Sequence, residues 1–212
     1  MNDTLNTLFN AIIAGDGAEV QKHVKVALEE KQEPTIILNE GMIAAMREVG
    51  RRFEEGDFFV PEMLLSARAM QAGMGVLKPS LQQSNVQSAG KVVIGTVKGD
   101  LHDIGKNLVA LMLEGAGFEI RDLGIDVAAE DFLAALQAEP ADILALSALL
   151  TTTLPSMKQT IKAVEEAGLR DRVKIIIGGA PVTEAYAKQI GADGFSPDAS
   201  RAVSVAEALM RK

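Results

Sequence analysis

One glycine-bounded stretch of the sequence concentrates the residues that could do chemistry. The segment "GTVKGDLHDIGKNL", residues 95–108, holds His102, one of two histidines in the chain, with Asp100 two residues before it. A metal-bound imidazole commonly donates its other ring N–H to a carboxylate, which fixes the tautomer and strengthens the ligand. A histidine in a turn is otherwise explained by a local hydrogen bond. His102 is therefore either a turn residue or a metal ligand that Asp100 orients.

Phosphate-binding loops provide a poor explanation for this stretch. Five residues separate Gly99 from Gly105, and Asn107 stands where a P-loop has the hydroxyl that binds magnesium. The dinucleotide pattern G-x-G-x-x-G is absent. A phosphoacceptor domain would need an aspartate at the end of its third strand, where this chain has Ser147.

An ordinary zinc or iron site is also a poor fit, because such a site needs three or four protein ligands. The second half of the chain has one histidine, and the whole chain has no cysteine. A metal bound by His102 would therefore arrive with most of its ligands already attached. That requirement describes a tetrapyrrole-type cofactor, either haem or a corrinoid.

Composition and charge exclude several other classes of protein. Of 212 residues, 48% are hydrophobic and 24% are charged, which is typical of a soluble globular protein. The formal net charge of -8 argues against nucleic-acid binding, because phosphate contacts dominate that affinity. No signal peptide or membrane span is recognisable. We expect a cytoplasmic protein that contacts neither nucleic acid nor membrane.

The elements that must position these residues fall into two halves. Residues 1–88 predict a bundle of four helices, over 4–15, 18–31, 34–56 and 60–81, from apolar residues at three- and four-residue spacing. A polar linker is predicted at about 79–90. Residues 89–212 alternate between short apolar runs and helical patterns, with strands expected at 91–97, 119–124, 142–149, 174–180 and 194–198. Helices are expected at 104–117, 129–139 with Asp126 as a cap, 154–168, 183–192 and 200–212.

Five β–α units predict an α/β domain with a parallel, doubly wound sheet of the flavodoxin-like, Rossmann type. Ligands of such sheets bind at the carboxyl ends of the strands. The loop that carries His102 follows the first strand and lies at that edge.

Three sequence elements resemble those of a known family. Asp100-Leu101-His102-Asp103-Ile104-Gly105 resembles the D-x-H-x-x-G signature of cobalamin-binding domains, Ser147-Ala148-Leu149 resembles its S-x-L element, and Gly178-Gly179 follows in the same order. In the first half, "GDFFVPEMLLSARAM" resembles the end of the helical cap that precedes this domain in methionine synthase and in the corrinoid proteins of methanol, methylamine and quaternary-amine methyltransferase systems. The resemblance spans nearly the whole chain.

The resemblance implies roles for individual residues. His102 would bind cobalt in place of the cofactor's own nucleotide base, and a relay from His102 through Asp100 to Ser147 would tune the metal. The displaced nucleotide tail would lie in a slot of the sheet domain. Further residues implied to contact the cofactor are Gly99, Leu101, Asp103, Ile104, Gly105, Leu149, Thr151, Thr153, Gly178, Gly179, Ala199 and, from the cap, Phe59. Met63 and Leu65 are less certain companions of Phe59. Bundle core is the alternative explanation for all three residues, and it is the favoured one for Met63 and Leu65.

The resemblance also implies a function. The chain would carry a methyl group on the cobalt of cobalamin or a related corrinoid, as methylcobalamin, between a substrate-specific methyltransferase and a second methyltransferase that uses tetrahydrofolate or a thiol coenzyme. A reductive activator is a further expected partner, and the chain itself would be a carrier subunit. The alternatives are a cobalamin-dependent regulator or another cobalamin-binding module without methyl transfer, an adenosylcobalamin isomerase, and a flavodoxin-like binding module without corrinoid. The sequence does not identify the methyl donor.

Overall fold

The chain divides into two compact units, residues 1–87 and 88–212. The computed structural model describes residues 3–83 and 88–211. The predicted boundary, between residues 88 and 89, differs from this division by one residue. The four-helix unit followed by an α/β unit is the fold class that the sequence predicts.

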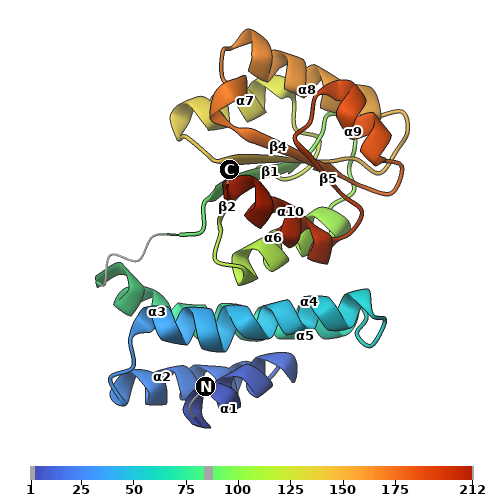
Figure 1. Cartoon of the computed structure of the whole chain (residues 1–212). Helices are drawn as coiled ribbons and strands as arrows, with labels where there is room; N and C mark the ends of the chain where they lie inside the picture. The colour runs from blue at the N-terminus through green and yellow to red at the C-terminus, as the bar shows by residue number, and fades with distance from the viewer. Residues whose placement is uncertain (1–2, 84–87, 212) are drawn as a thin grey trace. The chain divides into compact units, whose positions relative to one another are not determined.

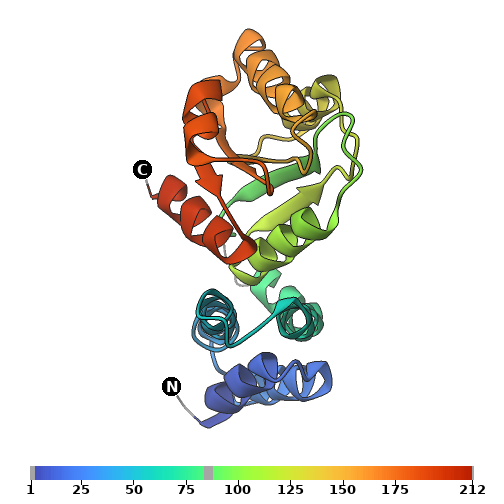
Figure 2. The same ribbon diagram turned by 90° about the vertical axis from the view of Figure 1, so that its right-hand side faces the viewer.

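The first unit contains the four predicted helical segments within its described residues. Helix α1 spans Asp3–Ile13, α2 spans Gly17–Glu29 and α5 spans Val60–Gln83. The third segment is continuous and consists of α3 (Pro34–Ile36), the π-helical η1 (Ile37–Ile43) and α4 (Ala44–Glu54). Figure 2 shows α1 and α2 as one layer and the pair α4 and α5 as a second.

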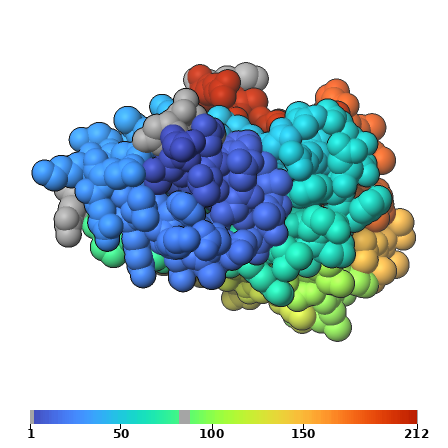
Figure 3. Space-filling model, turned by 90° about the horizontal axis from the view of Figure 1, so that it is seen from below, coloured from blue at the N-terminus to red at the C-terminus, as the bar shows by residue number. Residues whose placement is uncertain are grey.

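Local sequence explains where these helices begin and how closely they pack. The Asp16 side chain accepts hydrogen bonds from Ala18 N and Glu19 N at the start of α2. Gly41 lets α1 approach the third segment, because a Cβ there would lie 3.0 Å from Leu8 Cδ2. The side chains of α1 and α2 then form a continuous face of this unit, drawn in blue in Figure 3.

Two details of the helical unit differ from the prediction. The π-helical segment is not visible in the apolar spacing, because one wide turn changes that spacing only slightly. Helix α5 also continues through Pro79 to Gln83, so the first part of the predicted linker is helical. Leu77 and Leu81 are buried on either side of this proline, and their packing keeps the last turn helical. Residues 84–87 of the predicted linker lie outside the described residues.

The second unit is a five-stranded sheet in which every pairing is parallel. The strands are β1 (Lys91–Thr96), β2 (Glu119–Asp122), β3 (Ile143–Ser147), β4 (Lys174–Gly178) and β5 (Gly194–Ser196), in the spatial order β2-β1-β3-β4-β5. The helices are α6 (Ile104–Gly115), α7 (Ala129–Ala138), α8 (Leu154–Glu166), α9 (Glu184–Ile190) and α10 (Ala199–Met210), with a short 3-10 turn η2 at Arg170–Arg172. The predicted doubly wound fold is confirmed.

The two faces of the sheet are covered by different helices, as Figure 1 shows. Helices α7, α8 and α9 cover one face, and α6 and α10 cover the other. Alternate strand residues belong to the two cores. Leu144 and Leu146 pack on the side of α7 and α8, whereas Ile143 and Ala145 pack on the side of α6 and α10.

This topology creates a switch point between β1 and β3. The chain leaves β1 toward α6 on one face of the sheet and leaves the neighbouring β3 toward α8 on the other. Loops that diverge in this way leave a crevice at the carboxyl ends of the two strands, where α/β sheets bind their ligands. The His102 loop and residues 148–153 both lie at this end of the sheet, where Asp100 accepts hydrogen bonds from Leu149, Leu150 and Thr153.

Candidate functional site

His102 lies in the loop between β1 and α6, with its ring held by Asp100. Nδ1 of His102 donates a hydrogen bond to Asp100 Oδ1 at 2.7 Å, and the backbone N–H of His102 donates to the same oxygen at 3.1 Å. An ionised carboxylate can only accept, so Nδ1 carries the proton and Nε2 presents its lone pair. The side chain is 50% exposed, and Nε2 makes no hydrogen bond to any residue that the structure describes.

Asp100 is completely buried at the centre of a cluster of donors. Its Oδ2 accepts hydrogen bonds from Thr153 Oγ1 at 2.7 Å, from Leu149 N at 2.7 Å and from Leu150 N at 3.2 Å. Burial by itself would raise the pKa of Asp100, but the hydrogen bonds from Thr153, His102 and Leu149 outweigh it and hold that pKa well below its usual range. Asp100 therefore stays ionised, and its charge favours the orientation in which Nε2 of His102 faces outward.

The hydrogen bond predicted between Ser147 and Asp100 is made by Thr153 instead. Ser147 is the last residue of β3 and lies on the same side of the sheet as Ile143 and Ala145, under α6 and α10. The Asp100 carboxylate lies instead against the turn that leads into α8, where Thr153 is buried. Strand alternation could have revealed the difference, because it places Ser147 on the opposite side from Leu146.

The main chain of the His102 loop is held by three further residues that the sequence did not single out for this role. Thr96, fully buried at the end of β1, donates its hydroxyl to His102 O at 2.8 Å. Ser156 Oγ donates to Lys98 O at 3.0 Å. Asp126 Oδ1 accepts from Gly99 N at 2.8 Å. Asp126 was predicted as the cap of α7, and that prediction is wrong, because the N-cap of α7 is Ala128 and Asp126 turns toward the loop.

Apolar side chains and open space surround the exposed nitrogen. Leu101 and Ile104 on either side of His102 are 67% and 77% exposed, and Leu149 across the crevice is 42% exposed. At the start of α6, a Cβ on Gly105 would meet no atom within 4 Å. Asp103 is the N-cap residue of α6, and its carboxylate accepts a hydrogen bond from Asn107 Nδ2 at 3.1 Å.

The glycines predicted to admit the cofactor differ in what surrounds them. Gly179 has a φ of 132°, and a Cβ there would lie 1.8 Å from Ala148 O. A Cβ on Gly178 would lie 3.0 Å from Ser196 O. The protein's own backbone therefore requires glycine at 179 and leaves little room at 178, whereas the space at Gly105 is open. Gly99, with a φ of 85°, allows the tight turn that precedes Asp100.

The remaining predicted residues are placed as follows. Thr151 is exposed in the turn before α8, and Ala199 is buried at the first position of α10. In the helical unit, Phe59 is 66% exposed just before α5, and its N–H donates to Glu62 Oε2 at 3.0 Å. Met63 is fully buried, which makes it a core residue, and Leu65 is 51% exposed.

The residues around His102 fit a corrinoid. Such a group needs one nitrogen from the protein below its metal, an apolar surround for its ring, and close approach to the main chain. Nε2 of His102, the exposed side chains of Leu101 and Ile104, and the open space at Gly105 meet these needs. In the described part of the chain, no three His, Cys, Asp or Glu side chains gather into a metal site. No helix within residues 3–83 and 88–211 has the length and apolar character of a membrane span.

Comparisons with known proteins cover both units. Residues 90–204 match the family model described as a B12 binding domain, and residues 4–78 match a second model with the same description. Dimethylamine corrinoid protein 1 of Methanosarcina acetivorans is 43% identical over 203 residues, which are 93% of this chain and 95% of that protein.

Solved structures agree with the sequence relatives. A cobalamin-binding protein from Desulfitobacterium hafniense is 34% identical with a TM-score of 0.82, and the match covers 97% of this chain and 98% of that one. The methanol:cobalamin methyltransferase complex MtaBC of Methanosarcina barkeri contains a match at 30% identity and a TM-score of 0.87, over 99% of this chain and 80% of that one. The chain belongs to the family of two-unit, B12-binding corrinoid proteins, the methyl carriers of multi-component methyltransferase systems.

Proposed function

We propose that His102 would hold the cobalt of a corrinoid through Nε2 and that the chain carries a methyl group between two methyltransferases. The observation that carries the proposal is the state of the His102 ring. Nδ1 donates to a buried, ionised Asp100, and Nε2 is exposed without a hydrogen-bond partner among the described residues. A ring held in this way offers one nitrogen of fixed tautomer and direction.

The chain's own residues set how strongly that nitrogen binds. Asp100 holds the Nδ1 proton in place and raises the electron density of the ring, and Thr153 donates to the other oxygen of the same carboxylate. Any movement of a proton along this chain of hydrogen bonds changes the donor strength of Nε2. When bound, the corrinoid would supply methyl-transfer chemistry at its cobalt.

Other residues at the carboxyl edge have roles in holding the cofactor. The exposed side chains of Leu101, Ile104 and Leu149 would contact the ring, and Gly105 would let the main chain approach it. Ser147, Thr151, Gly178 and Ala199 would face the nucleotide tail, with Gly179 holding the loop beside it. In the helical unit, Phe59 is the residue that the family resemblance assigns to the corrinoid, and its side chain is 66% exposed.

The proposed partners follow from the relatives. Dimethylamine corrinoid proteins and the methanol methyltransferase complex point to a substrate-specific methyltransferase as methyl donor to this chain. A second methyltransferase would pass the methyl group to tetrahydrofolate or to a thiol coenzyme, and a reductive activator would restore cobalt that has become oxidised. The chain would thus be a carrier subunit rather than a complete enzyme. Relatives that span nearly the whole chain favour this function over a cobalamin-dependent regulator.

The test uses the two histidines as a matched pair. The protein is grown with ¹⁵N-labelled histidine, reconstituted with cobalamin and reduced to the cobalt(II) form for electron paramagnetic resonance. We expect a ligand splitting that changes with the isotope in the wild type and in His23→Ala, and that disappears in His102→Ala. His23 is the control because its Nε2 contacts Glu19 in the helical unit. Cobalamin binding without a histidine splitting, or a splitting that survives in His102→Ala, would overturn the proposal.

A further inference from the structure

The loop that follows β2 contains a residue in an unusual backbone conformation. Asp126 has a φ of 54°, in the left-handed region that residues other than glycine rarely occupy. Aspartate tolerates this region better than most residues, because its short side chain can form local hydrogen bonds. The conformation turns Asp126 away from helix α7, which begins three residues later, and toward the loop that carries His102.

Asp126 contacts three successive residues of that loop. Its Oδ1 accepts from Gly99 N at 2.8 Å, its Oδ2 accepts from Lys98 Nζ at 3.1 Å, and its own N–H donates to Asp100 O at 3.0 Å. The next residue, Val127, forms an isolated parallel bridge with Val97. One residue of the β2–α7 loop therefore holds the main chain of the segment immediately before the proposed ligand.

The three contacts differ in how much they can contribute. The Lys98 ion pair is exposed, with 61% and 40% of the two side chains accessible, so solvent weakens it. The Asp126 carboxylate accepts from the main-chain N–H of Gly99, and the bond from Asp126 N to Asp100 O joins two main-chain groups. Together these two bonds fix the main chain on both sides of the Gly99–Asp100 peptide. Asp100 is thus held from two directions, by Asp126 at its main chain and by Thr153 at its carboxylate.

We propose that Asp126 is a positioning residue for cobalt ligation, acting through Asp100 on His102. The inference rests on the proposed axial role of His102. Asp126 touches neither the ring of His102 nor the space above it. Its effect is to keep the Asp100 carboxylate at the one position from which it can accept both the Nδ1 proton and the α8 donors. Without it, the His102 ring loses its fixed direction, and binding of cobalt by Nε2 becomes incomplete.

Three substitutions distinguish the contribution of the Asp126 carboxylate from that of its backbone conformation. Asp126→Gly removes the carboxylate and keeps the positive φ at no steric cost. Asp126→Asn keeps an oxygen that can accept from Gly99 N and removes the charge. Lys98→Gln removes only the exposed ion pair. The control is Lys31→Gly, because Lys31 is the other non-glycine residue at positive φ in the described part of the chain, with a φ of 59°, and lies in the helical unit.

The readouts are cobalamin affinity, the histidine splitting of the cobalt(II) spectrum, and amide hydrogen exchange of the cofactor-free protein. For Asp126→Gly we expect affinity to fall about tenfold, the lower end of the range for partners of a metal ligand. We also expect loss of the histidine splitting in part of the molecules and faster exchange at Gly99 and Asp126. For Asp126→Asn, Lys98→Gln and Lys31→Gly we expect affinity within about twofold of the wild type.

Two results would overturn the inference. One is an Asp126→Gly protein that keeps wild-type affinity and the full histidine splitting, whatever its thermal stability. The other is an Asp126→Asn protein as defective as Asp126→Gly, which would make charge, and not position, the cause. If Asp126→Gly does not fold, Gly99 exchange in the cofactor-free wild type decides. Exchange as fast as in an unfolded chain would overturn the inference, and protected exchange would support it, because the bond from Gly99 N to Asp126 is the one on which the inference rests. Failure of the proposed function is distinguishable, because the wild type would then show no histidine splitting.

Discussion

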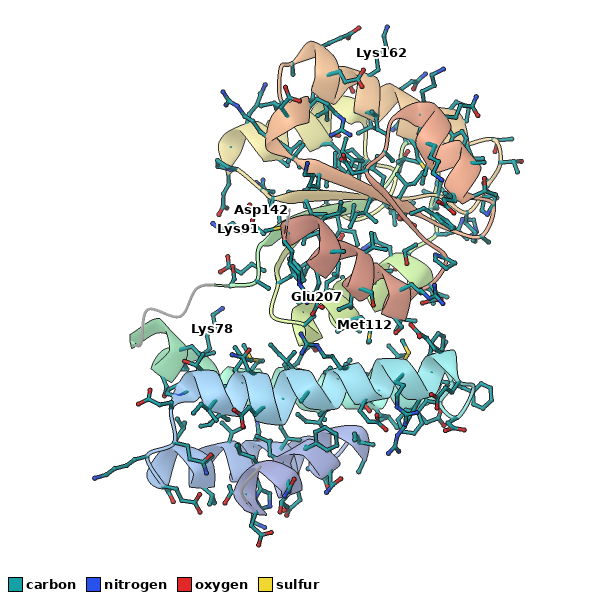
Figure 4. The ribbon with its side chains drawn as sticks, viewed as in Figure 1. Lys78, Lys91, Met112, Asp142, Lys162 and Glu207 are labelled. Carbon is teal, nitrogen blue, oxygen red and sulfur yellow. The ribbon has the colours of Figure 1, made fainter. Side chains whose placement is uncertain are left out.

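Aspartates accept main-chain N–H groups at both edges of the sheet, but their roles at the two edges differ. At the amino edge, Asp142 Oδ2 accepts from Lys91 N at 2.8 Å, and Asp193 Oδ2 accepts from Ile175 N at 2.7 Å and pairs with Arg170. Figure 4 shows Lys91 and Asp142 close together at that edge. At the carboxyl edge, Asp100 also accepts main-chain N–H groups, but one of its bonds comes from an imidazole with a second, exposed nitrogen.

In the proposed function, this difference would separate a structural edge from one that binds the cofactor. The amino edge even contains a pocket of about 200 Å³, lined in part by Lys91, Arg121 and Glu139. Three of its charged side chains have partners, because Lys91 pairs with Glu139 and Arg121 donates to Ala135 O. The carboxyl edge leaves apolar side chains and one ring nitrogen exposed. A ligand site is therefore better recognised from an unused binding group than from a hollow in the surface.

The largest expected changes in stability and in cobalamin binding concern two glycines of the carboxyl edge. Gly179→Ala should cost at least about 3 kcal/mol of unfolding free energy or prevent folding, since its Cβ would meet Ala148 O at a strained φ. Gly105→Ala should keep or slightly raise the stability of the cofactor-free protein, because its Cβ meets nothing, yet weaken cobalamin binding. Urea unfolding and cobalamin titration measure both effects. Wild-type affinity in Gly105→Ala would show that the open space is not used by the ligand.

A smaller effect is expected when Asp100 loses one donor. Thr153→Val should lower the free energy of unfolding by about 1–3 kcal/mol, since a buried carboxylate is left with an unmade bond. Cobalamin affinity should fall about tenfold. Thr153→Ser keeps the hydroxyl and should restore both, whereas Ser147→Ala should leave the stability of the cofactor-free protein within about 0.5 kcal/mol of the wild type. A larger loss of stability and affinity in Ser147→Ala than in Thr153→Val would instead support the predicted relay through Ser147.

The smallest effect is expected at the amino edge. Asp142→Ala removes the acceptor of Lys91 N and should cost about 1 kcal/mol of unfolding free energy. Asp142→Asn keeps an acceptor oxygen and should cost less. Cobalamin affinity should be unchanged in both, because the amino edge lies at the other end of the strands. Weaker binding in Asp142→Ala at unchanged stability would contradict the division between the two edges.

Sequence patterns predicted the elements and the central pair of the site. Apolar runs and glycine positions located all five described strands, and the two-residue spacing of Asp100 and His102 allowed their hydrogen bond to be expected. These features are local, so spacing along the chain determines them. The helical half was equally readable, apart from the π-helical turn and the last turn of α5.

Features that depend on contacts between distant segments could not be predicted in the same way. Ser147 and Thr153 both bear hydroxyls shortly after the third strand, and only the side of the sheet that each faces decides which one reaches Asp100. Asp126 has the sequence context of a helix cap, but its positive φ, supported by Gly99 from another loop, gives it a different partner. The exposed state of Nε2 likewise depends on burial that no local pattern encodes.

The bond from the buried Thr96 hydroxyl to His102 O has a consequence for the entropy of ligand binding. Together with Asp100, it orders both the main chain and the ring of His102 before any cofactor is present. Ordering a flexible side chain at an interface costs about 0.5–1.5 kcal/mol, and this protein meets that cost when it folds. In the proposed role of His102, the ring would therefore bind cobalt without first losing rotamer freedom.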